Sequence, residues 1–237
     1  MAIYSLNVSN VSRGTGSSSL ATLSYISGQK IYDERLGKTY NYGRKQRIVQ
    51  TGTMLPECAP FEFTNPETMF NSIEQCDHAK NARTAKKIMI ALPRELDLDQ
   101  QINLIERYIK VTLTDRGYAA VYAIHMDEAN HNPHVHILVP NRAINQNTGK
   151  WQPKRIMDYA RDEEGNRIPI IDKKTGKQKI DKRNRKQWKR IDISRNELDR
   201  KETVVRLRKT WTKECNRYLL KDQQIDDRSY ADRKIAE

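Results

Sequence analysis

The sequence has no long hydrophobic run, and this absence argues against a membrane protein. Its 237 residues contain no stretch of about 18 consecutive apolar residues, the length needed to span a bilayer. The N-terminus also lacks the apolar segment of a secretory signal. We therefore expect a cytoplasmic protein with no membrane partner.

Cysteine is scarce as well. The three cysteines, Cys58, Cys76 and Cys215, are odd in number, widely separated and without a Cys-x-x-Cys pair. A disulfide framework needs paired cysteines, and a thiolate zinc site needs closely spaced ones. The pattern therefore indicates reduced thiols in the core or at the surface.

Histidine is also rare, but its distribution is uneven. Four of the five histidines fall within residues 123–140. The segments 118–125 and 134–139 have the composition of strands, and the loop between them contains Asn132 and Pro133, which favour turns. This stretch therefore predicts a β-hairpin.

The predicted hairpin brings three histidines together. Side chains alternate between the two faces of a strand, so His134 and His136 share one face, and antiparallel pairing places His125 beside them. Three imidazoles can hold a catalytic metal while leaving positions open for substrate. By ligand preference they suit Mn, Co, Ni or Zn better than Mg. The alternative is an ordinary polar sheet face that is exposed to solvent.

Two residues of the hairpin loop bear on this predicted metal site. Asp127 could orient a ligating imidazole through its carboxylate, or it could be an ordinary turn aspartate. His131 could be a further ligand, but the site does not require one, because three imidazoles suffice for a catalytic metal.

Positive charge is concentrated in the last third of the chain. The formal net charge is +13, and residues 151–237 hold 26 Lys and Arg against 16 Asp and Glu, whereas residues 1–150 hold 17 against 14. A local basic excess of this size attracts polyanions, most often nucleic acid. The alternative is a lysine-rich surface that is merely solvated.

The order of the expected elements predicts an α+β fold. Hydrophobic periodicity, capping residues and turn residues indicate a strand at 2–9, a helix from Ser17, Ser18 or Ser19 to Gly28, a hairpin within 30–50, a helix from Asn65, a strand at 87–93, and a helix from Asp97 or Asp99 to Gly117. Such an order favours an antiparallel sheet with helices packed on one face. We expect a core of residues 1–150.

Residues 151–237 are expected to form a basic extension that packs on this core. A hairpin is predicted around Thr175 and Gly176, and a helix is predicted behind a capping box of Ser194 and Glu197. Trp211 lies on the apolar stripe of that helix and is expected in the core. We identify no internal repeat in the sequence.

Several motifs together resemble a known family. They are residues 19–28 (SLATLSYISG), 90–96 (IALPREL), 125–127 (HMD), 132–136 (NPHVH), 211–216 (WTKECN) and 225–229 (IDDRS). In this order they resemble the MobA/MobL-type relaxases of mobilisable plasmids, which belong to the histidine-hydrophobic-histidine endonucleases. The resemblance extends over almost the whole chain, and the ordered set is far more specific than the histidine motif alone.

The resemblance implies an activity and assigns roles to residues. It implies a bacterial enzyme with a fold like that of relaxases and rolling-circle initiators, which nicks single-stranded DNA at a plasmid transfer origin and rejoins it through a 5′-phosphotyrosyl intermediate. Tyr25 matches the nucleophile, and His125, His134 and His136 match the ligands of a divalent metal, Mn or Mg. Plasmid accessory and coupling proteins are the implied partners. Tyr32 is the nearest competitor of Tyr25 for the role of nucleophile. The alternative for Tyr25 is a tyrosine at a helix end that packs into the core.

This chain departs from the family in one segment. Many relatives carry glutamates before the Ala-Leu-Pro motif, and the matching positions here are Lys87 and Met89. Neither side chain can act as a general base near neutral pH. The remaining candidates for the base are Glu95, Asp127 and metal-bound water.

The DNA is expected to contact basic residues of the extension and a turn near the N-terminus. The predicted contacts are Arg13, Lys154, Arg155, Lys182, Arg183, Arg185, Lys186 and Trp188. Trp151 or Trp188 could stack on unpaired bases.

Two other functions are compatible with parts of the pattern. A rolling-circle replication initiator shares the histidine motif and the tyrosine chemistry, but its nucleophile usually follows the histidines, whereas Tyr25 precedes them. A non-catalytic nucleic-acid-binding module with a structural metal would leave Tyr25 replaceable. Loss of nicking on removal of the Tyr25 hydroxyl would separate the enzymes from the binding module.

Overall fold

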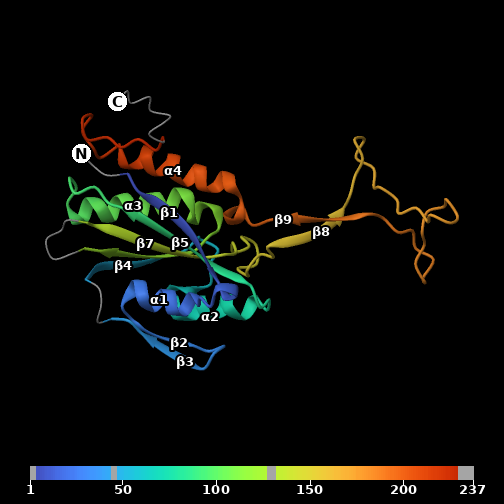
Figure 1. The fold of residues 1–237 in the computed structure, drawn as a ribbon, viewed down its shortest axis with the longest axis horizontal. Helices are drawn as coiled ribbons and strands as arrows, with labels where there is room; N and C mark the ends of the chain where they lie inside the picture. Colours follow the sequence, from blue (N-terminus) through green and yellow to red (C-terminus); the bar gives the residue numbers. More distant parts are fainter. Residues whose placement is uncertain (1–3, 44–46, 127–131, 229–237) are drawn as a thin grey trace. The chain divides into compact units, whose positions relative to one another are not determined.

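The centre of the protein is a five-stranded antiparallel sheet (Figure 1). The computed structural model describes residues 4–43, 47–126 and 132–228. The strands lie in the order β1 (Leu6–Ser12), β5 (Arg83–Ala91), β7 (His134–Pro140), β6 (Ala120–His125) and β4 (Ile48–Met54). Every neighbouring pair is antiparallel. The predicted α+β fold with an antiparallel sheet is therefore confirmed.

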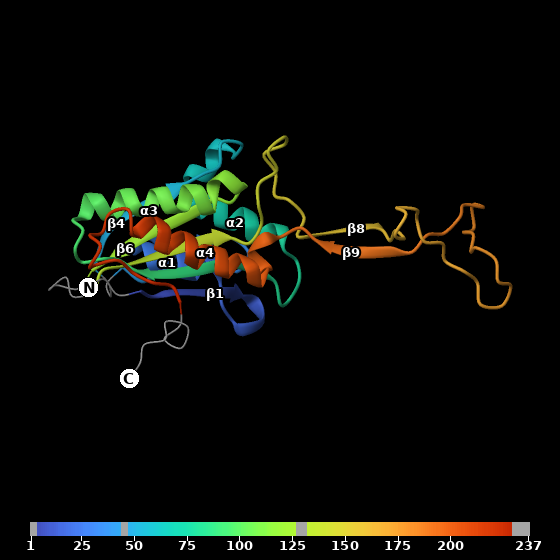
Figure 2. The ribbon, with the colours of Figure 1, turned by 90° about the horizontal axis from the view of Figure 1, so that it is seen from above.

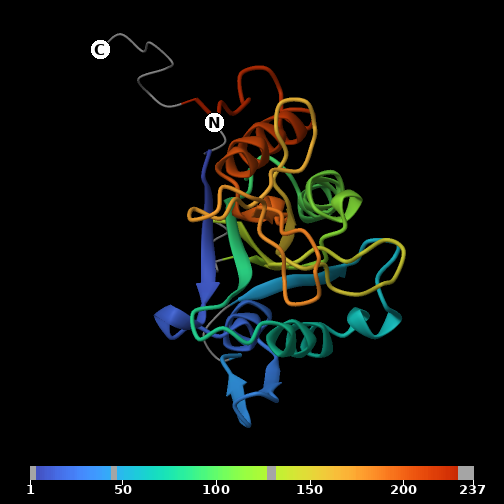
Figure 3. The ribbon, with the colours of Figure 1, turned by 90° about the vertical axis from the view of Figure 1, so that its right-hand side faces the viewer.

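Helices cover both faces of this sheet, so the prediction of helices on one face was wrong (Figure 3). One face packs against α3 (Leu98–Thr112) and α4 (Lys201–Cys215), and the other against α1 (Ser19–Ser27) and α2 (Pro66–Cys76). The physical reason lies in β6, where every residue is buried. A strand that is apolar on both faces needs cover on both.

A small hairpin lies outside α1. It consists of β2 (Lys30–Asp33) and β3 (Lys38–Asn41), which pair with each other in a separate two-stranded sheet. In Figure 1 this hairpin lies on the side of α1 that faces away from the central sheet. None of the described helices has both the length and the hydropathy of a membrane span.

The helix starts follow the predicted capping signals in most cases. The Ser18 side chain caps α1, and Gly28 ends it with a left-handed φ of 68°. Asn65 caps α2, and Asp97 forms a capping box with Gln100 at the start of α3.

The predicted start of the last helix was wrong. Ser194 ends β9 (Arg190–Ser194), Glu197 begins a short 3-10 helix, and α4 begins at Lys201 without a side-chain cap. Ser194 therefore belongs to a strand and cannot cap a helix. Two 15-residue helices, α3 and α4, lie side by side on one face (Figure 2).

The chain divides into two compact units. The core unit comprises residues 1–152 and 198–237, and the ribbon unit comprises residues 153–197. From the sequence we predicted one extension of residues 151–237. The structure instead includes α4 in the core unit, because Leu207, Trp211 and Cys215 are buried in the same cluster as α3. Truncation at residue 150 would therefore remove part of the core.

The ribbon unit is a long antiparallel excursion of the chain. It contains β8 (Arg155–Tyr159) paired with β9, followed by short bridges between facing segments. Three of its turns repeat one design, in which an aspartate side chain accepts backbone N–H groups two to four residues later. The aspartates are Asp162, Asp172 and Asp181. This turn motif recurs, although no repeat was identified from the sequence.

Candidate active site

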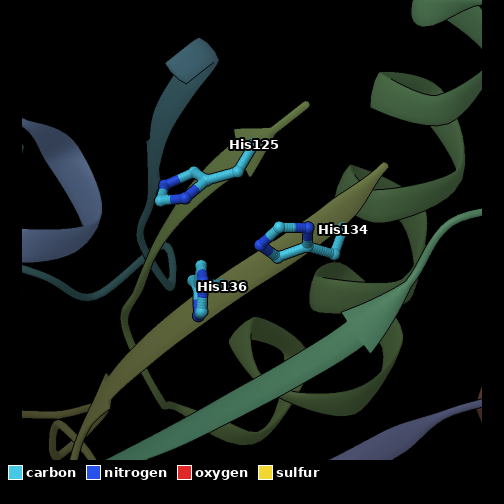
Figure 4. Close-up of side chains that lie close together, drawn as sticks. All are labelled: His125, His134 and His136. Carbon is cyan, nitrogen blue, oxygen red and sulfur yellow. The ribbon is translucent and has the colours of Figure 1, made fainter. Parts of the chain in front are cut away.

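Three histidines converge at one end of the β6–β7 pair (Figure 4). His125 pairs directly with His134, and Ala123 pairs with His136, so all three imidazoles lie on the same face. Their potential ligand atoms lie within 4.8 Å of one another. The convergence predicted from residue alternation is therefore confirmed.

The histidines lie on the face of the sheet that α1 covers. Their strand neighbours Ile124, Val135 and Ile137 point into the opposite core, against α3 and α4. His125 and His136 are only 4% and 5% exposed, while the neighbouring His134 is half-buried. The cluster is thus sheltered on one side and accessible through His134.

Backbone carbonyls orient two of the imidazoles. The Nε2 of His125 lies 2.7 Å from the Ile26 carbonyl oxygen, and the Nδ1 of His134 lies 2.8 Å from the Asn132 carbonyl oxygen. A carbonyl oxygen only accepts, so each of these nitrogens carries the proton and donates it. The other nitrogen of each ring keeps its lone pair for a ligand, as around bound metals.

The third imidazole contains a buried atom that lacks a protein partner. The Nδ1 of His136 neither accepts nor donates a hydrogen bond within the described part of the chain. Buried polar atoms are nearly always satisfied, so this nitrogen needs a ligand or a water molecule. Since each of the three imidazoles also offers a potential ligand atom within 4.8 Å of the others, the cluster fits a metal ion.

Two of the histidines, His125 and His136, are held in the neutral form that binds metals. Burial lowers the pKa of His136 to about 3, and the neighbouring His125, His134 and Lys87 act in the same direction. Burial also lowers the pKa of His125, against a smaller opposing effect of its hydrogen bond to Ile26. Both rings therefore keep a free lone pair at neutral pH.

Tyr25 lies beside this cluster. It occupies the last turn of α1, is 41% exposed, and its ring centroid lies 6.5 Å from that of His136 at an interplanar angle of 77°. A phenol and a potential metal site, distant in sequence, thus share one face of the sheet. Another tyrosine, Tyr42, lies beside Tyr25, and the centroids of the two rings are 6.2 Å apart.

Tyr32 was wrongly expected to be the closest competitor of Tyr25. On β2, its neighbours Ile31 and Asp33 are buried, whereas Tyr32 is 46% exposed. Because side chains alternate along a strand, Tyr32 points away from the body of the protein. The tyrosine whose ring meets that of Tyr25 is Tyr42, which directly follows β3. Spacing in the sequence could not reveal this contact.

The expected general bases are differently placed. The charge of Glu95 acts on the Cys215 thiol, which belongs to the α3–α4 core on the opposite face from the histidines. Asp127 and His131 lie outside the described residues. Among the described residues, the cluster of potential ligands contains the three histidines and no carboxylate.

Comparison with known proteins assigns the chain to a family. A family model described as the MobA/MobL family matches residues 17–237. The chain belongs to the MobA/MobL family. It is 53% identical over 233 residues to a probable mobilization protein MobA of Bifidobacterium longum (strain NCC 2705), covering 98% of this chain and 41% of that protein.

More distant relatives agree with the MobA/MobL assignment. The conjugal transfer protein TraA of Agrobacterium fabrum is 30% identical, over 62% of this chain and 14% of that protein. The mobilization protein MobL of Acidithiobacillus ferridurans is 30% identical, over 53% of this chain and 32% of that protein. The chain thus spans less than half the length of each of these relatives.

A solved structure shares the fold of this MobA/MobL chain. It is described as "Molecular Basis of Vancomycin Resistance Transfer in Staphylococcus aureus", and it superposes with a TM-score of 0.74 at 23% sequence identity. The match covers 97% of this chain and 100% of that one. At this identity the likeness shows the fold alone.

Arg13, predicted to contact DNA, has a structural position in this MobA/MobL chain. Its Nε donates to the Glu74 carboxylate at 2.9 Å, and its side chain is largely covered. Burial works to raise the pKa of Glu74, but hydrogen bonds from Ser19 and Arg13 help to outweigh it and hold the pKa below its ordinary value. Arg13 therefore links the first turn to α2.

The other predicted DNA contacts lie in the ribbon unit. Lys182, Arg183 and Lys186 are exposed, while Arg155 and Arg185 pair at the surface with Asp192 and Asp181 at 2.8 and 2.7 Å; Lys154 and Trp188 are half-buried. Surface pairs of this kind are weak and can exchange partners.

Two aromatic contacts were missed or misjudged from the sequence. Trp151 stacks on Phe63 at 5.0 Å and donates to the Ser72 hydroxyl, so its ring is already occupied in the core unit. In the ribbon unit, the Arg167 guanidinium lies 4.1 Å from the Tyr159 ring centroid. No local pattern in the sequence distinguishes these partners.

Proposed function

We propose that this MobA/MobL protein is a relaxase that nicks one DNA strand at a plasmid transfer origin and rejoins it through a phosphotyrosyl intermediate. The observation that carries the proposal is the position of Tyr25 beside His125, His134 and His136. A hydrolase would need only the histidine cluster. The nearby, half-exposed phenol supports covalent transfer instead.

In the proposed reaction, the Tyr25 hydroxyl oxygen attacks the scissile phosphorus. The new Tyr–O–P bond forms as the bond from phosphorus to the 3′ oxygen breaks, and the leaving strand takes up a proton as a free 3′ hydroxyl. The 5′ end stays on the protein. Because one phosphate ester replaces another, the step is reversible, and rejoining needs no nucleotide cofactor.

The residues of this chain prepare the nucleophile and hold the ion. A neutral phenol is a weak nucleophile, so its proton must leave as it attacks. We assign the proton acceptor to Asp127, two residues after His125, in preference to Glu95, whose charge acts on the other face. A divalent ion, when bound, supplies charge withdrawal at the phosphate. The family favours Mn or Mg, and three imidazoles suit Mn, Zn, Co or Ni.

The proposed substrate is single-stranded transfer-origin DNA. The ribbon unit contains 15 Lys and Arg against 8 Asp and Glu, and its exposed Lys182, Arg183 and Lys186 are suited to phosphate contacts. Trp188 is the proposed stacking residue of this unit. Plasmid accessory and coupling proteins are the proposed partners, and the bacterial cytoplasm is the proposed setting.

The test is a covalent capture experiment with Tyr25→Phe and a matched control. Oligonucleotides from candidate transfer origins are incubated with the protein and Mn²⁺, and the products are separated by mass. The wild type and Tyr32→Phe should give a free 3′ end and a protein-capped 5′ end, whereas Tyr25→Phe should give no adduct. Two free ends, or DNA on a peptide that lacks Tyr25, would refute the proposed chemistry.

A further inference from the structure

We propose that the β2–β3 hairpin positions Tyr25 for attack, and that Tyr42 is the positioning residue through which it acts. The inference rests on the proposed role of Tyr25. The Tyr25 and Tyr42 rings meet edge to face, with centroids 6.2 Å apart and an interplanar angle of 71°. This geometry is the favourable one for an aromatic pair.

Tyr25 is thereby flanked by two rings. His136 lies 6.5 Å from its centroid on the sheet, and Tyr42 lies 6.2 Å away on the hairpin side. At 41% exposure, the ring of Tyr25 is only partly surrounded by the core. Two aromatic neighbours therefore restrict a side chain that burial alone leaves free to change rotamer.

Tyr42 is itself held by the hairpin. Its ring is nearly parallel to that of Tyr40, with centroids 6.3 Å apart and an interplanar angle of 16°. Tyr40 is buried against α1, and the Lys38 ammonium lies 5.1 Å from its ring centroid. The stack passes from the core through Tyr40 to the half-exposed Tyr42.

The hairpin is fixed to both ends of α1. At the start of the helix, the Ser18 hydroxyl donates to the buried Asp33 carboxylate at 3.1 Å. At its end, Gly43 approaches Gly28 so closely that a Cβ on Gly43 would lie 2.6 Å from the Gly28 carbonyl oxygen. Such a contact leaves no room for a side chain. Gly43, the residue after Tyr42, therefore lies directly against Gly28, which ends the helix that carries Tyr25.

A second set of contacts fixes the hairpin to α2. The Tyr32 N–H donates to Glu67 at 2.9 Å, and the Asn71 amide donates to the Tyr32 carbonyl at 2.9 Å and accepts from the Glu34 N–H at 3.0 Å. The hairpin is thus anchored on two helices. Its position, and with it that of Tyr42, is set by the core unit.

The test compares Tyr42→Leu, which removes the ring, with Tyr42→Phe, which keeps it. Tyr32→Leu is the matched control, because Tyr32 is an exposed tyrosine of the same hairpin that points away from Tyr25. Single-turnover cleavage is measured with saturating oligonucleotide and Mn²⁺, and the Kd for the oligonucleotide is measured separately. We expect Tyr42→Leu to slow cleavage by roughly two- to tenfold, the scale of one aromatic pair, with Kd unchanged. Tyr42→Phe and Tyr32→Leu should match the wild type.

Three results would overturn the inference. Tyr42→Leu could cleave as fast as the wild type, Tyr42→Phe could be as slow as Tyr42→Leu, or the loss could fall on Kd alone, which would make Tyr42 a DNA contact. A second measurement separates this inference from the proposed function. Loss of Tyr42 should shift the ring proton resonances of Tyr25 in labelled protein, and loss of Tyr32 should not, whether or not a DNA adduct forms on Tyr25.

Discussion

On the face of the sheet that packs against α3 and α4, β6 contributes Ala120, Tyr122 and Ile124 to a continuous apolar cluster. On the opposite face, the same strand contributes Val121 and Ala123 to a second cluster and then ends in His125. Alternate residues of β6 therefore pack against the two helix layers, α3–α4 on one face and α1–α2 on the other. The two faces differ at the end of this strand, where the last residue is apolar Ile124 on one face and polar His125 on the other.

The α3–α4 face is closed by large side chains. Trp211 is fully buried and meets Tyr108 edge to face at 5.3 Å, and the Tyr108 hydroxyl donates to the Leu207 carbonyl at 3.2 Å. Close packing of this kind contributes stability in proportion to the apolar area removed from water. This face therefore holds the sheet together.

The α1–α2 face combines apolar packing with buried polar groups. Glu74 accepts from Ser19 and Arg13, Asp33 accepts from Ser18, and the Nδ1 of His136 has no hydrogen-bond partner among the described residues. Such groups contribute less net stability than apolar side chains of the same size, but they fix directions. The α3–α4 layer thus mainly stabilises the strands, and the α1–α2 layer also orients the groups at their ends.

The largest effect is expected when a proposed metal ligand is removed from the α1–α2 face. Replacing His125, His134 or His136 by Ala should lower cleavage by about a hundred- to a thousandfold or more, since charge stabilisation at the phosphate is lost. DNA affinity should stay near the wild-type value, because it comes from phosphate contacts elsewhere. Cleavage and binding assays with Met89→Leu as control would measure both. A triple alanine variant that still nicks in EDTA would contradict the prediction.

Removal of a large side chain from the α3–α4 face should lower the free energy of unfolding and leave the cleavage reaction unchanged. Trp211→Ala should lower the free energy of unfolding by about 3–5 kcal/mol, the usual cost of a large cavity. Val205→Ala, at an exposed position of the same helix, should change it by less than about 0.5 kcal/mol. Urea unfolding measures both values. A loss below about 1 kcal/mol for Trp211→Ala would show that α4 does not close the core.

A smaller effect is expected from pH. The unfolded chain protonates His136 near an ordinary pKa of about 6.5, while the folded protein resists protonation down to a pKa of about 3. In the metal-free protein, the contribution of neutral His136 to the free energy of unfolding should therefore be fully present above about pH 6.5. It should be lost progressively as the pH falls toward 3. Between pH 7.5 and 5.5 the loss from His136 is about 1 kcal/mol.

The measurement is urea unfolding in EDTA at the two pH values. His136→Gln should lose less stability over this interval than the wild type. Glu74, whose pKa is lowered, titrates below its ordinary range and does not contribute here. An equal loss in both proteins would assign the effect to other groups.

Local features of the site and the fold could be predicted from the sequence. The alternation of His134 and His136, the cap at Ser18 and the stop at Gly28 are each encoded within a few residues. Period and capping act over one turn or one strand, so they depend little on distant contacts, although the capping box predicted at Ser194 gave way to the pairing of β9 with β8. The histidine cluster could be predicted from these signals and from pairing across one short loop.

Features that depend on distant contacts could not be predicted in the same way. The approach of Gly43 to Gly28 and the contact between Tyr42 and Tyr25 join segments that no periodicity relates. The presence of helices on both faces of the sheet could have been predicted, because residues 118–124 form an unbroken apolar run that is typical of a strand buried on both faces. The Asp172 turn had a signal in the sequence as well, because the Asn145 side chain of the core unit accepts backbone N–H groups in the same way, and residues 144–150 (INQNTGK) and 171–177 (IDKKTGK) share five of seven residue types if Asn and Asp are counted alike.

The antiparallel pairing of β8 with β9 has a consequence for how this family can vary. Arg155 pairs with Ser194, and the Arg195 N–H donates to the Lys154 carbonyl at 2.8 Å, so the ribbon unit begins and ends at adjacent points. An excursion with adjacent ends can lengthen, shorten or change its sequence without altering the path of the chain on either side. Its surface is therefore free to diversify between relatives while the strand order that aligns Tyr25 with the histidines stays the same.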